Sequence, residues 1–266
     1  MVSQRALDYK EISTEHILLL DDDVLLHPRS AQILLEQIHK CNGDCVAADT
    51  FANHEMSVIS KIKAIIGNLV FPRFTQDWAF KLHPNGSFSY LNKIKQDIYP
   101  SQTAAGPCSL WKKKSLLALR FQDEKWLDRF GFAFGDDDLE FFKLHINGGR
   151  LFVSFTAGVT NLDSKSASAL FQQNEHKFYI RSMSNFIRWY RMQYEPRQNL
   201  KRTFAMLSFG LKMSWLTCIH LAISALSFNV KPLFFFINGL SHGISFVRSK
   251  EYKNIPCYKN ENIVLN

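Results

Sequence analysis

The stretch that decides the fold is an apolar run that ends in three carboxylates, Ile17-Leu18-Leu19-Leu20-Asp21-Asp22-Asp23. Four consecutive apolar residues predict a β-strand that is buried on both faces and central in its sheet. Carboxylates beside such a core need a partner, because buried charges are costly and adjacent like charges repel one another. We therefore expect a divalent cation at the end of this strand, since Mg²⁺ and Mn²⁺ prefer oxygen ligands. The alternative is an acidic turn ahead of the next helix, expected from about Pro28 to Lys40.

The chain has 266 residues, of which 46% are hydrophobic and 21% are charged. This length allows one large domain or one domain with an appendage, and the composition excludes a disordered chain. The cysteines are spaced irregularly, which matches neither a zinc site nor a disulfide framework. We therefore expect a reducing compartment. These cysteines are Cys41, Cys45, Cys108, Cys218 and Cys257.

The net charge is +8, and Phe is unusually common, at 23 residues. A basic surplus suits nucleic acid, anionic lipid or phosphorylated substrates. Lys and Arg are spread along the chain without an RNA- or DNA-binding motif, so no nucleic-acid partner is expected. The abundance of Phe favours a segment that contacts a membrane.

The rest of the chain reads as alternating strands and helices. We predict further strands at 45–48, 103–111 and 150–155, and helices at 112–119, 136–147 and 167–194. Residues 71–99 are rich in aromatic and turn-forming residues and predict loops and irregular strands, whereas residues 51–70 are ambiguous. We expect a domain at 1–195, a basic and apolar helical segment at 196–250, and a polar tail at 251–266.

The segment after Pro196 changes in composition. Residues 204–230 are almost wholly apolar, and several Arg and Lys residues precede them. The window 213–230 is close to the shortest length that spans a bilayer, roughly 17 residues. We favour a helical hairpin that lies on the cytoplasmic face of a membrane, because basic residues favour that side. A spanning helix and a helical cover for the domain are the alternatives.

A second acidic cluster, Asp136-Asp137-Asp138, opens the predicted helix at 136–147. Acidic residues at a helix start are favoured by capping and by the helix dipole, but one aspartate is enough for that purpose. Three aspartates favour a carboxylate that deprotonates an acceptor hydroxyl as a general base. One cluster for a metal and another for a base are typical of a nucleotide-sugar transferase, in which the leaving diphosphate is neutralised and the acceptor is activated.

The motifs together resemble a family 2 glycosyltransferase with the GT-A fold, a Rossmann-like mixed sheet flanked by helices. Leu18 to Asp23 is similar to the strand that ends in the family's DxD motif, and 104–111 is similar to its acceptor-side segment. Residues 135–149 are similar to its acidic helix, and 181–190 to its helix with arginine and asparagine. Residues 238–243 are similar to the ending of rhamnosyl- and galactofuranosyltransferases. The resemblance covers about residues 15–248.

This resemblance implies a role for each motif. Asp21 and Asp23 would bind Mn²⁺ or Mg²⁺, and Asp22 would face the donor sugar or its ribose. Asp137 would be the catalytic base, with Asp136 or Asp138 as substitutes. Gly106 and Trp111 would bind the acceptor. The implied reaction moves a sugar, with inversion, from a nucleotide-diphosphate donor to a glycan or lipid-linked glycan.

Two departures from the family pattern shape the expectation. Members usually carry a strand and loop for the nucleotide base ahead of the DxD strand, so we expect an N-terminally incomplete catalytic domain. Many members also carry a metal-binding His where this chain has residues 159–163. Either Asn161 or Asp163 replaces it with an oxygen ligand, or the site has only the pair Asp21 and Asp23. The alternatives are an inactive glycosyltransferase remnant, a membrane-attached scaffold, or another metal-dependent phosphotransferase.

Overall fold

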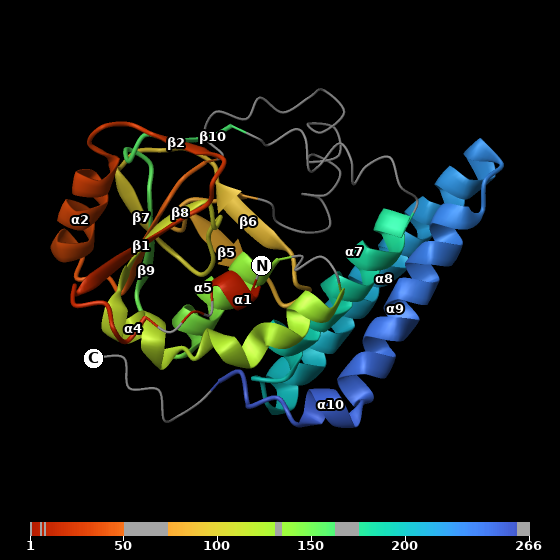
Figure 1. The fold of residues 1–266 in the computed structure, drawn as a ribbon. Helices are drawn as coiled ribbons and strands as arrows, with labels where there is room; N and C mark the ends of the chain where they lie inside the picture. Colours follow the sequence, from red (N-terminus) through yellow and green to blue (C-terminus); the bar gives the residue numbers. More distant parts are fainter. Residues whose placement is uncertain are drawn as a thin grey trace.

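A computed structural model describes residues 2–5, 7, 9–50, 74–130, 135–162 and 176–259. Figure 1 shows a mixed α/β part beside a group of long C-terminal helices. The predicted class, a mixed sheet flanked by helices with an apolar helical extension, is confirmed at this level. The ambiguous residues 51–70 lie outside the described ranges.

The main sheet has five strands in the order β1-β8-β3-β9-β7. Strands β3 and β9 are parallel, and the other neighbours are antiparallel. The predicted strands at 16–20 and 45–48 are confirmed, and those at 103–111 and 150–155 have shorter bounds. The strands are β1 His16–Leu20, β3 Cys45–Ala48, β7 Ile98–Ser101, β8 Cys108–Lys112 and β9 Leu151–Ser154.

Strand β1 is an edge strand, which corrects the prediction of a central position. Among the described strands it pairs only with β8. Ile17 and Leu18 pack into clusters on opposite faces of the sheet, whereas Leu20 is 45% exposed. The apolar run therefore indicates only that both faces of the strand are covered by other parts of the protein. It carries no information about which strands lie to either side, because that depends on residues far away in the chain.

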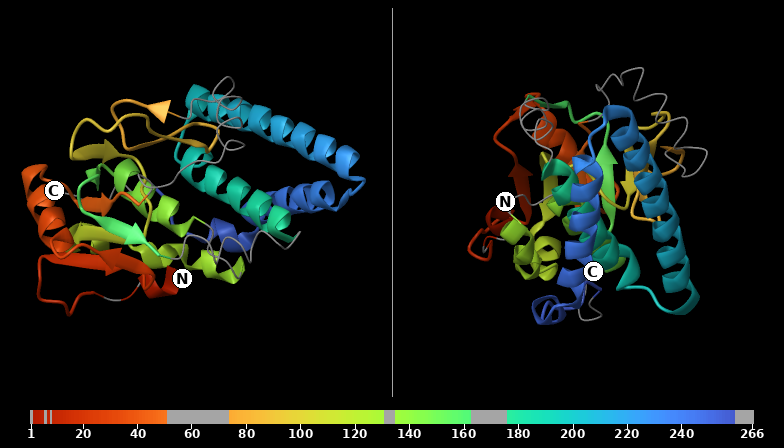
Figure 2. Two further views of the ribbon diagram at one scale, coloured as in Figure 1. Left: turned by 90° about the horizontal axis from the view of Figure 1, so that it is seen from above. Right: turned by 90° about the vertical axis from the view of Figure 1, so that its right-hand side faces the viewer.

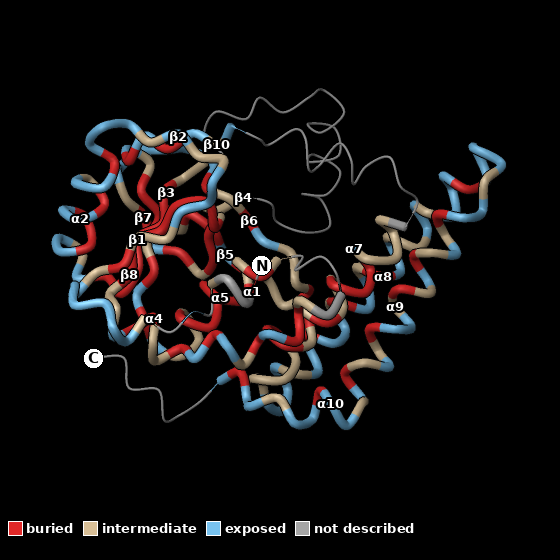
Figure 3. The backbone as a smooth tube through the Cα atoms, viewed as in Figure 1, coloured by how far each residue is buried: buried red, intermediate tan, exposed pale blue. Residues whose placement is uncertain are grey.

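Different helices cover the two faces of this sheet (Figure 3). On one face, α2 (Ser30–Lys40) buries Leu34 and Ile38 against β3 and β8. On the other face, α4 (Lys113–Ala118) and α5 (Asp136–Ile146) pack on β1, β3, β8 and β9. There the Phe141 ring stacks on Trp111 with centroids 5.4 Å apart. This packing fixes the start of α5 relative to the sheet.

Two smaller sheets flank the main one. Strands β4 (Phe74–Thr75), β5 (Phe80–Leu82) and β6 (Phe88–Leu91) form the first, in the order β4-β6-β5. These short strands lie within the region predicted as loops and irregular strands. Strands β2 (Val24–Leu26) and β10 (Val159–Asn161) form the second, an antiparallel pair.

The C-terminal region is a long helical hairpin packed on a third helix. Its main helices are α8 (Asn199–Ser227) and α9 (Lys231–Arg248), and α7 (His176–Trp189) runs into a π-helical turn, η2 (Tyr190–Tyr194). The turn between α8 and α9 lies far from the main sheet in Figure 1 and in the left view of Figure 2. The predicted apolar stretch is thus confirmed as helical. The remaining elements are α1 (Val2–Arg5), η1 (Phe121–Phe130) and α10 (Lys250–Lys253).

Two glycines of the 238–243 motif allow α9 to approach α7 closely. A Cβ on Gly239 would lie 2.2 Å from the Tyr179 carbonyl oxygen, and one on Gly243 would lie 3.1 Å from that of Met183. Small residues at four-residue spacing on one helix face permit this contact. The motif therefore has a packing role in this fold.

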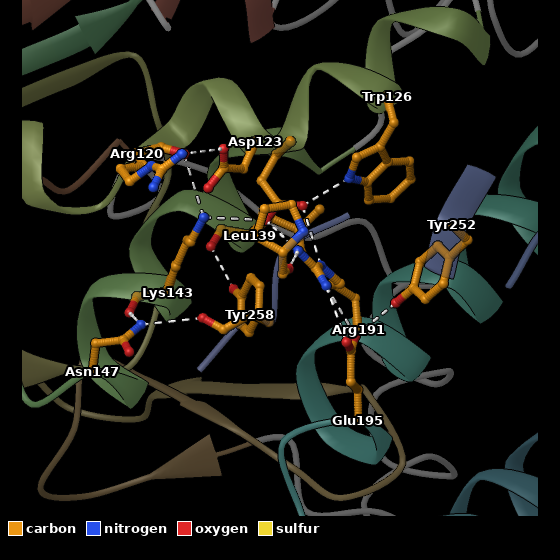
Figure 4. Close-up of polar contacts among 12 residues, drawn as sticks. Arg120, Asp123, Trp126, Leu139, Lys143, Asn147, Arg191, Glu195, Tyr252 and Tyr258 are labelled. Atoms are coloured by element: carbon orange, nitrogen blue, oxygen red, sulfur yellow. Dashed lines mark hydrogen bonds and ion pairs between the residues drawn. The ribbon is translucent and has the colours of Figure 1, made fainter. Parts of the chain in front are cut away.

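Figure 4 shows Arg191, Lys143 and Trp126 of a buried network that ties η2 to the α/β part, and the centre of this network is Glu124. Its carboxylate is fully buried, 2.8 Å from Arg191 and 3.2 Å from Lys143. Arg191 also pairs with Glu195, at 3.0 Å. Burial raises the pKa of Glu124, but Arg191 and Lys143 outweigh burial and hold that pKa below its ordinary value.

The described end of the chain packs into the same region. The Tyr258 hydroxyl is buried and donates to the Leu139 carbonyl at 2.5 Å, and Arg191 donates to the Pro256 carbonyl at 2.8 Å. Tyr252 donates to Glu195 at 2.8 Å. The described part of the predicted polar tail is therefore bound to α5 and η2 through buried tyrosines.

We expect Glu124→Gln to lower the free energy of unfolding by about 3–5 kcal/mol, because it leaves a buried cation without its partner. Asp123→Asn is the control, since Asp123 pairs with Arg120, which is 58% exposed. That variant is expected to lose less than about 1 kcal/mol. Urea unfolding followed by circular dichroism measures both, and equal losses would contradict the assignment.

Candidate functional site

The two acidic clusters meet at the end of β1. The Asp21 amide donates to the Pro107 carbonyl at 2.9 Å, which continues the pairing of β1 with β8. One residue earlier, the Gly106 amide donates to Asp137 at 3.2 Å. The loop before β8 thus joins Asp21 to the start of α5. Three motifs predicted separately, at 21–23, 106 and 136–138, form one site.

Gly106 has no room for a side chain. A Cβ there would lie 2.0 Å from Oδ1 of Asp137, so any other residue would displace this carboxylate. The backbone amide of Gly106 therefore positions the predicted base. Its predicted contact with an acceptor is not tested and stays a prediction.

The start of α5 does not use its aspartates as side-chain caps. The N-cap is Gly135, in the left-handed conformation at φ +78°, and no side chain caps the helix. A Cβ at Gly135 would also collide with the Arg188 guanidinium. The capping interpretation of the 136–138 cluster accordingly loses its main support, although the helix dipole still favours negative charge there.

Arg5 lies between the two clusters. Its guanidinium is 3.4 Å from Asp21, 3.9 Å from Asp136 and 3.7 Å from Glu140. It also forms a close ion pair with Asp137. No sequence signal points to this residue, because a lone arginine at position 5 has no motif around it. Its role depends on the packing of α1.

Asp138 has a different set of partners. It pairs closely with Arg188 of α7 and accepts a bond from the Thr103 hydroxyl at 3.2 Å. Arg188 is in turn held by Asn185 at 2.8 Å. Arg188 and Asn185 belong to the helix singled out by the family resemblance. The structure thus brings a fourth predicted motif to the site, beside a pocket lined by Trp189.

Two carboxylates of α5 are buried at the site. Asp136 is 5% exposed and Glu140 is 1% exposed. Burial raises the pKa of Glu140 to about 7, although Arg5 lowers it, and burial likewise raises the pKa of Asp136. Glu140 follows Asp136 by one helical turn, so the four-residue spacing places both on one helix face.

Trp111 does not belong to the site. Its side chain is fully buried, its indole donates to the Ser109 hydroxyl at 2.9 Å, and its ring stacks on Phe141. A side chain without exposed surface cannot contact an acceptor, so the predicted acceptor role of Trp111 is corrected to a core role. Its large apolar surface accounts for this position in the middle strands of the sheet.

The oxygen donors at 21–23 suit a hard cation but do not complete its coordination. Within the described ranges, no group of three or more His, Cys, Asp or Glu side chains is placed to hold a metal ion. Mg²⁺ is commonly held by one or two carboxylates together with substrate phosphates. Asp21 and Asp23 fit that pattern and stay predicted ligands. Asn161 ends β10, opposite Val24, and Asp163 lies outside the described residues.

Comparison with known proteins gives no family assignment, because no protein-family model matches the chain and no curated protein matches it significantly. The family resemblance therefore stands on the motifs, their order and their convergence.

We expect Glu140→Gln to be more stable than the unchanged protein at pH 8. The carboxyl pKa rises on folding from 4.5 to about 7, so the folded state binds the extra proton and stability falls as pH rises through this window. The shift corresponds to about 3 kcal/mol. The advantage is expected to vanish near pH 4.5.

Denaturant unfolding at pH 4.5, 6 and 8 measures this difference. Glu36→Gln on the exposed side of α2 is the matched control, for which no pH-dependent gain is expected. Absence of a gain at pH 8 would show that Glu140 is already well paired as a carboxylate.

Proposed function

We propose that this chain is an inverting, metal-assisted glycosyltransferase of the GT-A type that uses a nucleotide-diphosphate sugar. The observation that carries the proposal is the convergence of residues 21–23 and 136–138, joined through Pro107 and Gly106. Carboxylates after a strand and at a helix start then face one another. This pairing suits a donor diphosphate on one side and an acceptor hydroxyl on the other.

Each aspartate has a proposed role. Asp21 and Asp23 would hold Mn²⁺ or Mg²⁺, which when bound neutralises the charge of the diphosphate. Asp22, which is exposed, would face the donor sugar or its ribose. Asp137 accepts the proton of the acceptor hydroxyl as its oxygen bonds to the anomeric carbon, while the bond to the diphosphate breaks and its electron pair leaves with the diphosphate. Gly106 keeps Asp137 oriented for this step.

The acceptor side is proposed at the pocket beside Asp138. Asn185 and Arg188 supply hydrogen-bond donors there, and Phe88 and Trp189 supply apolar faces. Aromatic faces with a few polar groups are typical of a binding pocket for a polar ligand. A glycan or a lipid-linked glycan fits this lining.

Assay of nucleoside diphosphate release, with a panel of nucleotide sugars, Mn²⁺ and membrane-lipid acceptors, tests the proposal. We expect Asp137→Asn to lose roughly 100-fold or more of the turnover, because the loss of a general base has effects of that size. Asp123→Asn, away from the site, is expected to keep its activity. A folded protein that neither transfers nor hydrolyses any donor would contradict the proposed function.

A membrane surface is the proposed location, with the cytoplasmic face as its side. By length and composition, α8 is able to cross a membrane. Its outer face carries exposed Leu207, Leu211 and Trp215, and the turn to α9 carries Phe228, which is 98% exposed. Residues 196–250 contain no Asp or Glu and seven Lys or Arg. An apolar face among basic residues suits an anionic bilayer.

We expect the protein to co-sediment with vesicles that contain phosphatidylglycerol and to bind neutral phosphatidylcholine vesicles less. Leu207→Glu with Leu211→Glu is expected to weaken vesicle binding at least tenfold, because both charges would enter the lipid interface. Leu35→Glu on α2, where Leu35 is 41% exposed, is the control and should bind normally. Equal binding by all three proteins would rule out this face as the membrane contact.

A further inference from the structure

One guanidinium serves four carboxylates at the candidate site. Asp21, Asp136 and Glu140 each have an oxygen within 4 Å of Arg5, and Asp137 pairs with it closely. These carboxylates come from the end of β1 and the first turns of α5. An ordinary ion pair matches one cation with one carboxylate, whereas here four carboxyl groups share the Arg5 guanidinium.

The buried members of the group are not satisfied by Arg5. Both carboxylate oxygens of Glu140 and Oδ2 of Asp136 are buried and have no hydrogen-bond partner. Buried polar groups without a partner carry a desolvation cost, so native structures rarely retain them without a reason. The group therefore accommodates more positive charge than one arginine supplies, which points to a cationic ligand.

Arg5 is placed by packing rather than by charge alone. Val2, one turn earlier, is fully buried and packs with Leu127 and Leu139. Its amide donates to Asp128 at 2.9 Å, and the Tyr9 hydroxyl donates to the Arg5 carbonyl at 3.2 Å. The backbone of α1 is thus anchored on η1, while the long Arg5 side chain, 18% exposed, reaches into the site.

We propose that Arg5 and a divalent cation are competing occupants of this site. In this structure the Arg5 guanidinium pairs with Asp21 and Asp137. It would leave both carboxylates when a divalent ion binds. The inference rests on the proposed function, which places a metal at Asp21. Competition follows because a divalent ion and the Arg5 guanidinium, both held beside Asp21, would repel each other as like charges.

Displacement of Arg5 has a consequence for the proposed base. While Arg5 pairs with Asp137, the guanidinium occupies the carboxylate that is proposed to receive the proton of the acceptor hydroxyl. When the guanidinium swings away, Asp137 keeps its hydrogen bond from the Gly106 amide. Departure of the Arg5 guanidinium would therefore leave the Asp137 carboxylate open to an acceptor hydroxyl.

Titration with Mn²⁺, followed by the electron paramagnetic resonance signal of the free ion, tests the competition without an activity assay. We expect Arg5→Gln to bind Mn²⁺ at least tenfold more tightly than the unchanged protein. Arg248→Gln, an exposed position at the end of α9, is the matched control and should bind as the unchanged protein does.

A second measurement uses the unchanged protein, in case Arg5→Gln does not fold. Phenylglyoxal modifies accessible arginines, and peptide mass spectrometry reports each site. Saturating Mn²⁺ is expected to raise the labelling rate of Arg5 several-fold, while the buried Arg191 serves as the internal reference.

An unchanged Mn²⁺ affinity in folded Arg5→Gln, or an unchanged labelling rate of Arg5, would overturn the competition and leave Arg5 as a fixed counter-ion. The proposed sugar transfer would survive that result. Failure of every variant to bind Mn²⁺ would overturn the competition and also remove the metal from the proposed function.

Discussion

Repulsion among carboxylates is the constraint on which the candidate site depends. Asp21 reaches the site from β1, and Asp136, Asp137 and Glu140 reach it from α5, so the fold must hold like charges together. Pairing of β1 with β8 and the missing side chain at Gly106 provide the geometry. Arg5 and Arg188 offset part of the repulsion. Such a concentration of charge costs stability, and functional sites are where proteins commonly carry that cost.

Much of the fold could be predicted because its signals are local. The apolar runs at 16–20 and 45–48 and the helix that starts at Asp136 follow from neighbouring residues alone. The edge position of β1 could not be predicted in this way, because strand order depends on contacts between distant segments. The same limit applies to residues 251–259, whose polar composition hides Tyr252 and Tyr258, two tyrosines that are buried by α5 and η2.

The same distinction between local and distant signals applies to the candidate site. Clustered aspartates are visible in the sequence, and their order along the chain led to one site that the packing of α5 on the sheet brings together. The acceptor role predicted for Trp111 is wrong because an aromatic residue beside a motif is as well suited to a core as to a ligand. Arg5 was missed because a counter-ion is defined by what surrounds it in space. The place of Glu140 beside Asp136 could be predicted, since the two residues are one helical turn apart.

The central claim is that residues 21–23, on the donor side, and residues 136–138, on the acceptor side, together form one catalytic site. The most direct measurement is an anomalous difference map, at the manganese absorption edge, from crystals soaked with Mn²⁺ and a nucleoside diphosphate. We expect one strong peak within bonding distance of Asp21 or Asp23, with diphosphate density between that peak and Asp137. A manganese peak only at other positions, or diphosphate bound away from both aspartate clusters, would contradict the account.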